Sequence, residues 1–277
     1  MTTELVSATA SSTVHDVIQQ MVARDVGRII IIRDDIPVGI FTERHVLKHV
    51  VNNNLDPERT PVAEVMTAPF RAVAQDTHIV DALGEMIKGN FRHLQVLGTR
   101  DNILGIVSMR RILEIAVQLG HGLKENKTIG NIISQAPLSM DESASVWDAV
   151  ELMNEKGAGA VVATSAQQPV GIFTERDVLN RVVAKKLDAR TTLLKDVMTS
   201  PLIAMPISAQ VGEVLGQMYR RDIRNMPILG EWDQLVGLVS MQDVLQFARA
   251  FDIDEEVRRT WKEILNFYDS QYDFTPG

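Results

Sequence analysis

Apolar residues recur along the chain in short blocks whose spacing alternates between that of a helix and that of a strand. The block Ser145–Lys156 carries apolar residues at helical spacing and begins with a serine, a residue type that caps helices. The apolar runs Ala160–Ala163 and Val170–Phe173 predict two strands, and the polar segment Gln167–Pro169 between them predicts a turn. Thr174 then caps a second helix. The predicted order is helix, strand, strand, helix.

The same order of elements is predicted in the second and fourth units. Their first helices are predicted at Ile79–Lys88 and Ala209–Arg220, and strands at His93–Leu97 and Asn225–Leu229. Short lead-in segments are predicted at Val62–Met66 and Leu193–Met198, and the third unit has a similar one near Thr128–Ile133. Closing helices are predicted after Ser108 and Ser240. In the first block the lead-in segment would precede Met1, so we expect a first unit that is truncated at its front.

These blocks are copies of one another. The string GIFTER occurs at Gly39–Arg44 and at Gly171–Arg176, an offset of 132 residues, and the same offset relates Val65–Thr67 to Val197–Thr199. A weaker repeat within each half gives four related units, and a repeat of this size determines the fold class. Helix capping suffices to explain the repeated glutamates, Glu43 and Glu175.

Composition narrows the class of protein. Of 277 residues, 45% are hydrophobic, which is enough for packed cores, and no run is long enough to span a membrane. The N-terminus lacks the features of a signal peptide, so we expect a cytoplasmic protein. The absence of Cys excludes disulfides and thiolate sites. The net charge of −8 disfavours general nucleic-acid binding, although a local cluster of Arg and Lys could still bind the phosphates of a small molecule.

Each unit ends with a glycine, two apolar residues and a Ser or Thr, and in two units an Asp follows three residues later, as in Thr174–Asp177 and Ser240–Asp243. With the Met-Thr-x-Pro segments Met66–Pro69 and Met198–Pro201, this pattern resembles the cystathionine-β-synthase (CBS) domain family over roughly residues 5–250. The resemblance implies an α+β fold of four tandem CBS repeats, each a small mixed or antiparallel sheet with helices, paired into two modules and followed by a C-terminal helix. The expected boundaries are 1–57, 58–121, 122–188 and 189–251 for the four units and 252–277 for the helical extension.

In that family, clefts between paired domains bind adenosine derivatives such as AMP, ATP or S-adenosylmethionine. A hydroxyl, free backbone amides and a carboxylate at the start of a helix suit a ribose and its phosphate. We therefore interpret Asp177 and Asp243 as ribose acceptors. The alternative is that Ser/Thr-x-x-Asp is an ordinary capping box. In the first half, His45 and Arg111 replace these carboxylates, either as cationic phosphate contacts or as structural residues.

The resemblance also implies the walls of both pockets. The Asp177 pocket would use Thr199–Ile203 and Arg224, and the Asp243 pocket would use Ala136–Leu138 and Gly157–Gly159, whose small residues let a base approach the backbone. The predicted ligand-binding residues are Thr174, Arg176, Asp177, Ile203, Arg224, Leu138, Gly159, Ser240 and Asp243. Arg224 is the first candidate phosphate ligand and Arg176 the second, with Arg92 equivalent to Arg224. The alternatives are solvated surface arginines, and core positions for Ile203 and Leu138.

No Walker loop, HExxH motif or nucleophile elbow occurs in the sequence. We therefore expect no enzyme and no metal site, but a regulatory protein that binds AMP, ADP, ATP or S-adenosylmethionine and acts on an unknown protein effector, with no membrane or nucleic-acid partner. The first alternative is a ligand-free scaffold that uses the amphipathic segment Glu255–Tyr268 for protein interaction. A third hypothesis is nucleotide hydrolysis in the clefts. The sequence does not determine whether two modules of one chain, or a homodimer, bring the modules face to face.

Overall fold

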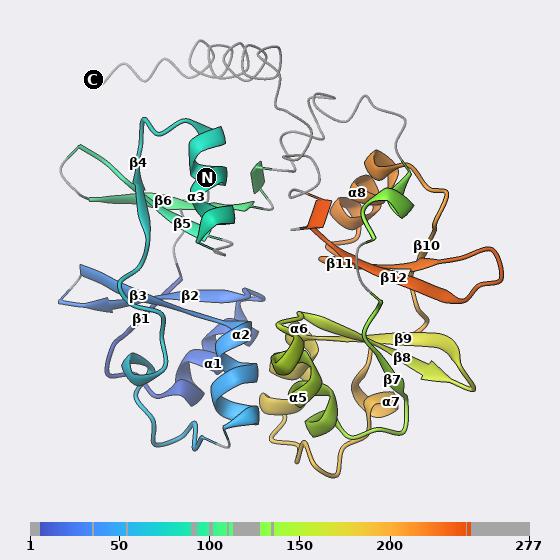
Figure 1. Cartoon of the computed structure of the whole chain (residues 1–277). Helices are drawn as coiled ribbons and strands as arrows, with labels where there is room; N and C mark the ends of the chain where they lie inside the picture. The colour runs from blue at the N-terminus through green and yellow to red at the C-terminus, as the bar shows by residue number, and fades with distance from the viewer. Residues whose placement is uncertain are drawn as a thin grey trace.

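The structure, a computed structural model, describes residues 6–34, 36–53, 55–89, 93–99, 102–109, 111–112, 128–133, 136–241 and 243–244. Within these ranges the chain forms four units, each built on a three-stranded sheet (Figure 1). In every sheet a short first strand runs parallel to the second strand, and the second runs antiparallel to the third. These mixed sheets with their helices confirm the predicted α+β class.

The elements of the first unit are β1 (Ser7–Thr9), α1 (Val14–Ala23), β2 (Arg28–Arg33), β3 (Ile36–Thr42), α2 (Glu43–His45) and the π-helical η1 (Val46–Asn52). Those of the second unit are η2 (Val62–Glu64), β4 (Ala72–Ala74), α3 (Ile79–Lys88), β5 (His93–Leu97) and β6 (Ile103–Ser108). Those of the third unit are η3 (Ile129–Asn131), β7 (Ser139–Asp141), α5 (Val146–Lys156), β8 (Ala160–Ser165), β9 (Gln168–Thr174), α6 (Glu175–Asp177) and the π-helical η4 (Val178–Val183). Those of the fourth unit are α7 (Leu194–Val197), β10 (Met205–Pro206), α8 (Val211–Arg220), β11 (Asn225–Leu229) and β12 (Leu235–Ser240).

Local sequence signals account for both ends of α5. The hydroxyl of Ser145 accepts a hydrogen bond from the backbone N–H of Asp148 at 3.1 Å, as a helix cap does. The helix ends at Gly157, whose φ of 64° is left-handed and favours glycine. The elements α3, β5 and β11 have the predicted bounds, whereas α8 begins two residues later than predicted, at Val211.

Two features of the sheets differ from the predictions. The predicted turn over Gln167–Pro169 is wrong for its last two residues, because the hairpin turns at Ala166 and Gln167, where φ is 48° and 67°, and β9 starts at Gln168. A two-residue turn with two positive φ angles matches the twist of the flanking strands, so pairing resumes at once. The short parallel strand that opens each sheet was also not predicted, because two or three residues carry no visible period.

The first and third units pack against each other within one chain. In Figure 1, α2 and α6 lie side by side, and η1 contacts both α5 and η4. Leu47 of η1 lies in the buried cluster of the third unit with Phe173, and Leu179 of η4 lies in the cluster of the first unit with Phe41. The two leucines are related by the repeat offset, so each half inserts the same residue into the other. One chain therefore supplies both faces of this contact.

This exchange predicts a large effect of truncating either leucine. We expect Leu179→Ala to lower the free energy of unfolding by about 2–5 kcal/mol, because Leu179 is only 1% exposed and its loss leaves a cavity between the halves. Urea denaturation measures the change. Leu187→Ala is the matched control: Leu187 is 42% exposed and should change stability by less than about 0.5 kcal/mol. An unchanged midpoint for Leu179→Ala would contradict the packing described.

The start of α2 is capped by a neutral histidine. The backbone N–H and the hydroxyl of Thr42 each lie 2.9 Å from Nδ1 of His45, and Nε2 of His45 lies 2.8 Å from the hydroxyl of Thr67. Burial, followed by the neighbouring His49 and Lys48, lowers the pKa of His45 from 6.5 to about 4. With Nδ1 accepting the N–H of Thr42, Nε2 carries the proton and donates to Thr67.

The lowered pKa of His45 makes stability depend on pH. Between pH 6.5 and about 4 the unfolded chain binds a proton that the folded chain excludes, so stability falls as the pH drops through this window. We expect His45→Asn to lose stability less steeply than the parent protein between about pH 7 and about pH 5, as measured by urea denaturation at each pH. Equal slopes for the two proteins would show that His45 titrates normally in the folded state.

Candidate functional site

Ser240 and Asp243 form a capping box at the end of the fourth unit. Oδ2 of Asp243 accepts hydrogen bonds from the backbone N–H and the hydroxyl of Ser240, both at 2.7 Å. Ser240 is the last residue of β12, and its hydroxyl in turn accepts from the N–H of Asp243 at 3.2 Å. Among the described residues, Oδ1 of Asp243 has no hydrogen-bond partner, so it can accept from a ligand.

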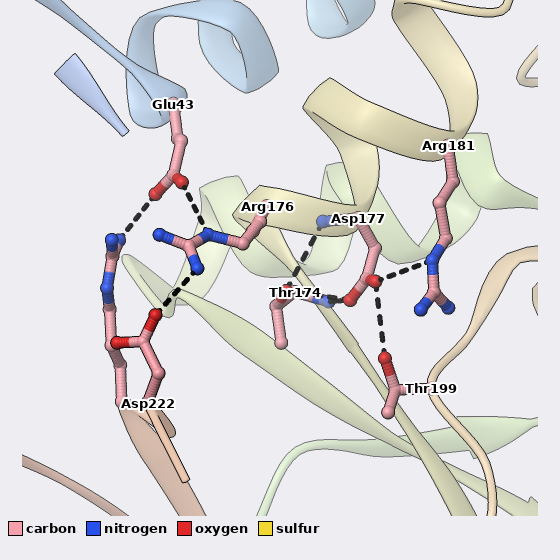
Figure 2. Close-up of polar contacts among 8 residues, drawn as sticks. Glu43, Thr174, Arg176, Asp177, Arg181, Thr199 and Asp222 are labelled. Carbon is pink, nitrogen blue, oxygen red and sulfur yellow. Dashed lines mark hydrogen bonds and ion pairs between the residues drawn. The ribbon is translucent and has the colours of Figure 1, made fainter. Parts of the chain in front are cut away.

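In the third unit, neighbouring side chains and a backbone N–H contact both oxygens of the equivalent carboxylate, Asp177 (Figure 2). Oδ2 of Asp177 accepts from the N–H and hydroxyl of Thr174 at 2.9 and 2.7 Å. Its Oδ1 accepts from the hydroxyl of Thr199 and pairs with Nε of Arg181, both at 3.3 Å. Asp177 is 6% exposed, and burial raises its pKa. The structure thus brings Asp177 to Thr199, as predicted, but fills both of its oxygens.

A cavity of about 900 Å³ brings together residues of all four units. It is lined by five of the predicted site residues, namely Leu138, Gly159, Arg224, Ser240 and Asp243. The predicted walls Ala136–Leu138 and Gly157–Gly159 both face this cavity, and a Cβ on Gly157 would have no atom within 4 Å. Among the described lining residues, the cavity does not include the remaining four predicted site residues, Thr174, Arg176, Asp177 and Ile203.

The lining carries more positive than negative charge although the chain is acidic. Its described cations are Arg28, Arg44, Arg71, Lys156 and Arg224, and its described carboxylates are Glu43, Glu175 and Asp243. A surplus of cations in a concave site raises the local concentration of anions. The lining therefore favours a ligand that carries negative charge. Sequence reasoning missed Arg44 and Lys156, because neither lies in the motifs that end the second-half units.

The two copies of the Thr-Glu-Arg sequence are paired across the halves. Oε1 of Glu43 accepts from Nε of Arg176 at 3.2 Å, and its Oε2 accepts from Arg224. Oε1 of Glu175 accepts from Nε of Arg44 at 2.9 Å. Both glutamates are at most 5% exposed. Helix capping alone is therefore not a sufficient explanation for them, because each neutralises an arginine of the other half.

These ion pairs use some of the N–H donors of both predicted phosphate ligands, Arg176 and Arg224. Arg176 also donates to Asp222 at 3.0 Å, and Arg224 reaches Glu43 from the edge of the cavity. Burial by itself raises the pKa of Glu43, but the guanidinium groups of Arg224 and Arg176 outweigh it and hold that pKa below its ordinary value. Glu43 is therefore a carboxylate at neutral pH, shared by arginines from two other units.

The first-half counterparts of the two aspartates differ from each other. His45 lines the cavity, and burial lowers its pKa to about 4, so its ring is neutral at neutral pH, which favours the structural alternative over a cationic phosphate contact. Arg111 is exposed, and its backbone N–H donates to the hydroxyl of Ser108 at 3.2 Å. Nε2 of His45 contacts Thr67, which is the first-half equivalent of Thr199. His45 thus reproduces the structural contacts of a carboxylate without its charge.

Some predictions lie outside the described residues. These are Arg92, the helix predicted over Glu255–Tyr268 and the extension 252–277. Within the described ranges, no group of three His, Asp or Glu side chains could hold a metal ion. No helix in the same ranges has the length and hydropathy needed to cross a membrane.

Comparison with known proteins identifies the repeated unit. The model of the CBS domain matches residues 1–52, 62–118, 129–184 and 194–250. A CBS domain-containing protein of Arabidopsis thaliana is 23% identical over 97% of this chain and 57% of its own length. The meiotically up-regulated gene 70 protein of Schizosaccharomyces pombe is 24% identical over 83% of this chain and 40% of its own length. The chain spans about half the length of these relatives.

A solved structure has a similar fold over most of the chain. The crystal structure of a Methanocaldococcus jannaschii protein, described as a proposed archaeal homologue of γ-AMPK, covers 89% of this chain and 97% of its own with a TM-score of 0.77. At 15% sequence identity, this likeness concerns the fold. The fold, the repeated endings and the four matches agree, and the chain belongs to the CBS domain family, with four CBS domains in one polypeptide.

Proposed function

We propose that this chain is a regulatory protein that binds an adenine nucleotide in the central cavity, at the pocket of Asp243. The observation that supports this most strongly is the open Oδ1 of Asp243, in a cavity that also contains Leu138, a wall of small residues and a surplus of cations. A cavity of about 900 Å³ lies within the range of roughly 300–1,000 Å³ found for small-molecule sites.

Each part of the pocket has a role in this proposal. Oδ1 of Asp243 accepts hydrogen bonds from the ribose hydroxyls, while Ser240 fixes Oδ2 and so orients the carboxylate. Leu138 and Leu238 cover the faces of the base, which the backbone at Gly159 can approach closely. The phosphates lie toward the cations, of which Arg224 is the one predicted from the sequence.

The pocket of Asp177 is the second candidate in the same module. Its ligand would have to displace Arg181 and Thr199 from Oδ1, and the carboxylate is buried. The roles of Thr174, Arg176 and Ile203 as ligand contacts depend on that displacement, and Ile203 is 37% exposed. The geometry therefore favours occupancy at Asp243 first.

In this proposal, Arg224 links ligand binding in the cavity to the relative arrangement of the two halves. It lines the cavity and also pairs with Glu43 of the first unit. A phosphate that draws Arg224 away would leave the buried carboxylate with fewer cations, so the free energy of the contact between the halves would depend on the ligand. The relative populations of two module arrangements would then report the nucleotide to an effector protein.

Titration calorimetry with AMP, ADP, ATP and S-adenosylmethionine tests the proposal. We expect about one ligand per chain, and Asp243→Ala should weaken binding roughly 10- to 100-fold, because hydrogen bonds to a charged group contribute about 1.5–3 kcal/mol. Asp177→Ala is the matched control: it removes the same type of capping box outside the cavity. It should leave the affinity within about twofold.

The other outcomes have distinct meanings. Two ligands per chain, each lost with one of the two substitutions, would mean that both pockets of the second module are competent. Weakening by Asp177→Ala alone would assign the site to the third unit. An absence of heat with all four ligands, together with an unchanged melting temperature, would refute nucleotide binding and favour the scaffold.

A further inference from the structure

We propose that Arg44, a residue of the first half, is a phosphate-binding cation of the Asp243 pocket, so that this pocket is completed across the duplication. The inference rests on the proposed function, because it assigns a residue to the same site. It was not evident from the sequence, where Arg44 is part of the GIFTER repeat in a half that lacks both aspartates.

Two bonds fix the guanidinium of Arg44 against the opposite wall. Its Nε donates to Oε1 of Glu175 at 2.9 Å, and an Nη2 proton is donated to the backbone carbonyl of Gly157 at 3.1 Å. Gly157 and Glu175 both line the cavity, as does Arg44 itself. The side chain of Glu175 is only 6% exposed, so the anchoring carboxylate is shielded from solvent.

The same guanidinium retains donors for a ligand. Arginine has five N–H donors, and Arg44 uses two of them in its contacts with the described residues. Its side chain is 40% exposed, compared with 31% for the ion-paired Arg176, so a ligand in the cavity can reach it. A planar cation that is already oriented loses little entropy when it binds a phosphate, and its fork geometry matches two phosphate oxygens.

The repeat-related arginine shows that this placement is specific. Arg176 occupies the equivalent position in the second GIFTER, but it is bound by Glu43 at 3.2 Å and by Asp222 at 3.0 Å. Among the described residues that line the cavity, Arg44 is included and Arg176 is not. Identical sequence therefore gives one arginine that faces the ligand space and one whose role is structural.

A phosphate contact predicts an effect that grows with the charge of the ligand. We expect Arg44→Ala to weaken AMP and ATP binding by about tenfold or more while the affinity for adenosine stays within about twofold, as measured by titration calorimetry. Arg59→Ala is the control, because the side chain of Arg59 is 89% exposed and is not among the described residues that line the cavity. It removes an arginine of the same half, and it should leave the AMP-to-adenosine affinity ratio unchanged.

A second variant tests the anchoring of Arg44 without removing its charge. Glu175→Gln keeps the size of the side chain but loses the ion pair to Arg44, so AMP affinity should fall by a smaller factor than in Arg44→Ala, with adenosine again unaffected. This variant also covers the case in which Arg44→Ala fails to fold, which the melting temperature would reveal.

The outcomes separate this inference from the proposal beneath it. If Asp243→Ala weakens adenosine and AMP alike while Arg44→Ala and Glu175→Gln leave the AMP-to-adenosine ratio at the parent value, Arg44 is structural and the inference is overturned, but the pocket stands. An equal fall in that ratio in Arg44→Ala and Arg59→Ala would also overturn it. If the parent protein binds none of the three ligands, the proposed function and this inference both fail.

Discussion

The burial of two glutamates between the halves is the constraint on which the rest of the structure depends. Glu43 and Glu175 are both almost inaccessible, and an unpaired buried carboxylate costs several kcal/mol, roughly 3–5 when a partner is removed. Each finds its cation on the other half, in Arg176 and Arg44. The observed placement of the halves forms both pairs together. That placement also lets the leucines of η1 and η4 exchange clusters and encloses the central cavity.

The fold could be predicted because its information is local and repeated. Helix α3 and strands β5 and β11 have the predicted bounds, since period, caps and turns occur within each element. What could not be predicted depends on pairing at a distance. The three residues of β1 form a strand because β2 lies beside them, and Gln168 enters β9 because two left-handed residues close the hairpin. Neither effect is visible in the hydrophobic pattern.

Five of the nine candidate site residues predicted from the sequence line the central cavity, but the sequence did not distinguish the two pockets. Thr174–Asp177 and Ser240–Asp243 are the same motif, and in both the carboxylate caps its own helix. Their difference arises from side chains that approach Asp177 from outside the motif, above all Arg181 one helical turn later. The ion pairs between the two GIFTER copies could also have been predicted, because each copy contains a Glu followed by an Arg. When two copies of a motif meet about an approximate twofold axis, opposite charges within it are brought into reciprocal contact.

Duplication has therefore given equal motifs unequal roles, and the reason is physical. Around the centre, Asp177 is satisfied by Arg181 and Thr199, and His45 satisfies the same contacts as a neutral ring. Asp243 alone among these three capping residues keeps an open acceptor within the described structure. A ligand held there lies among residues of all four domains, so its binding free energy includes the cost or gain of moving them. A pocket inside one domain would lack that dependence. The units that contain His45 and Asp177 are thus part of the function proposed for the Asp243 pocket, because their satisfied contacts hold the surrounding structure in place when an anion binds.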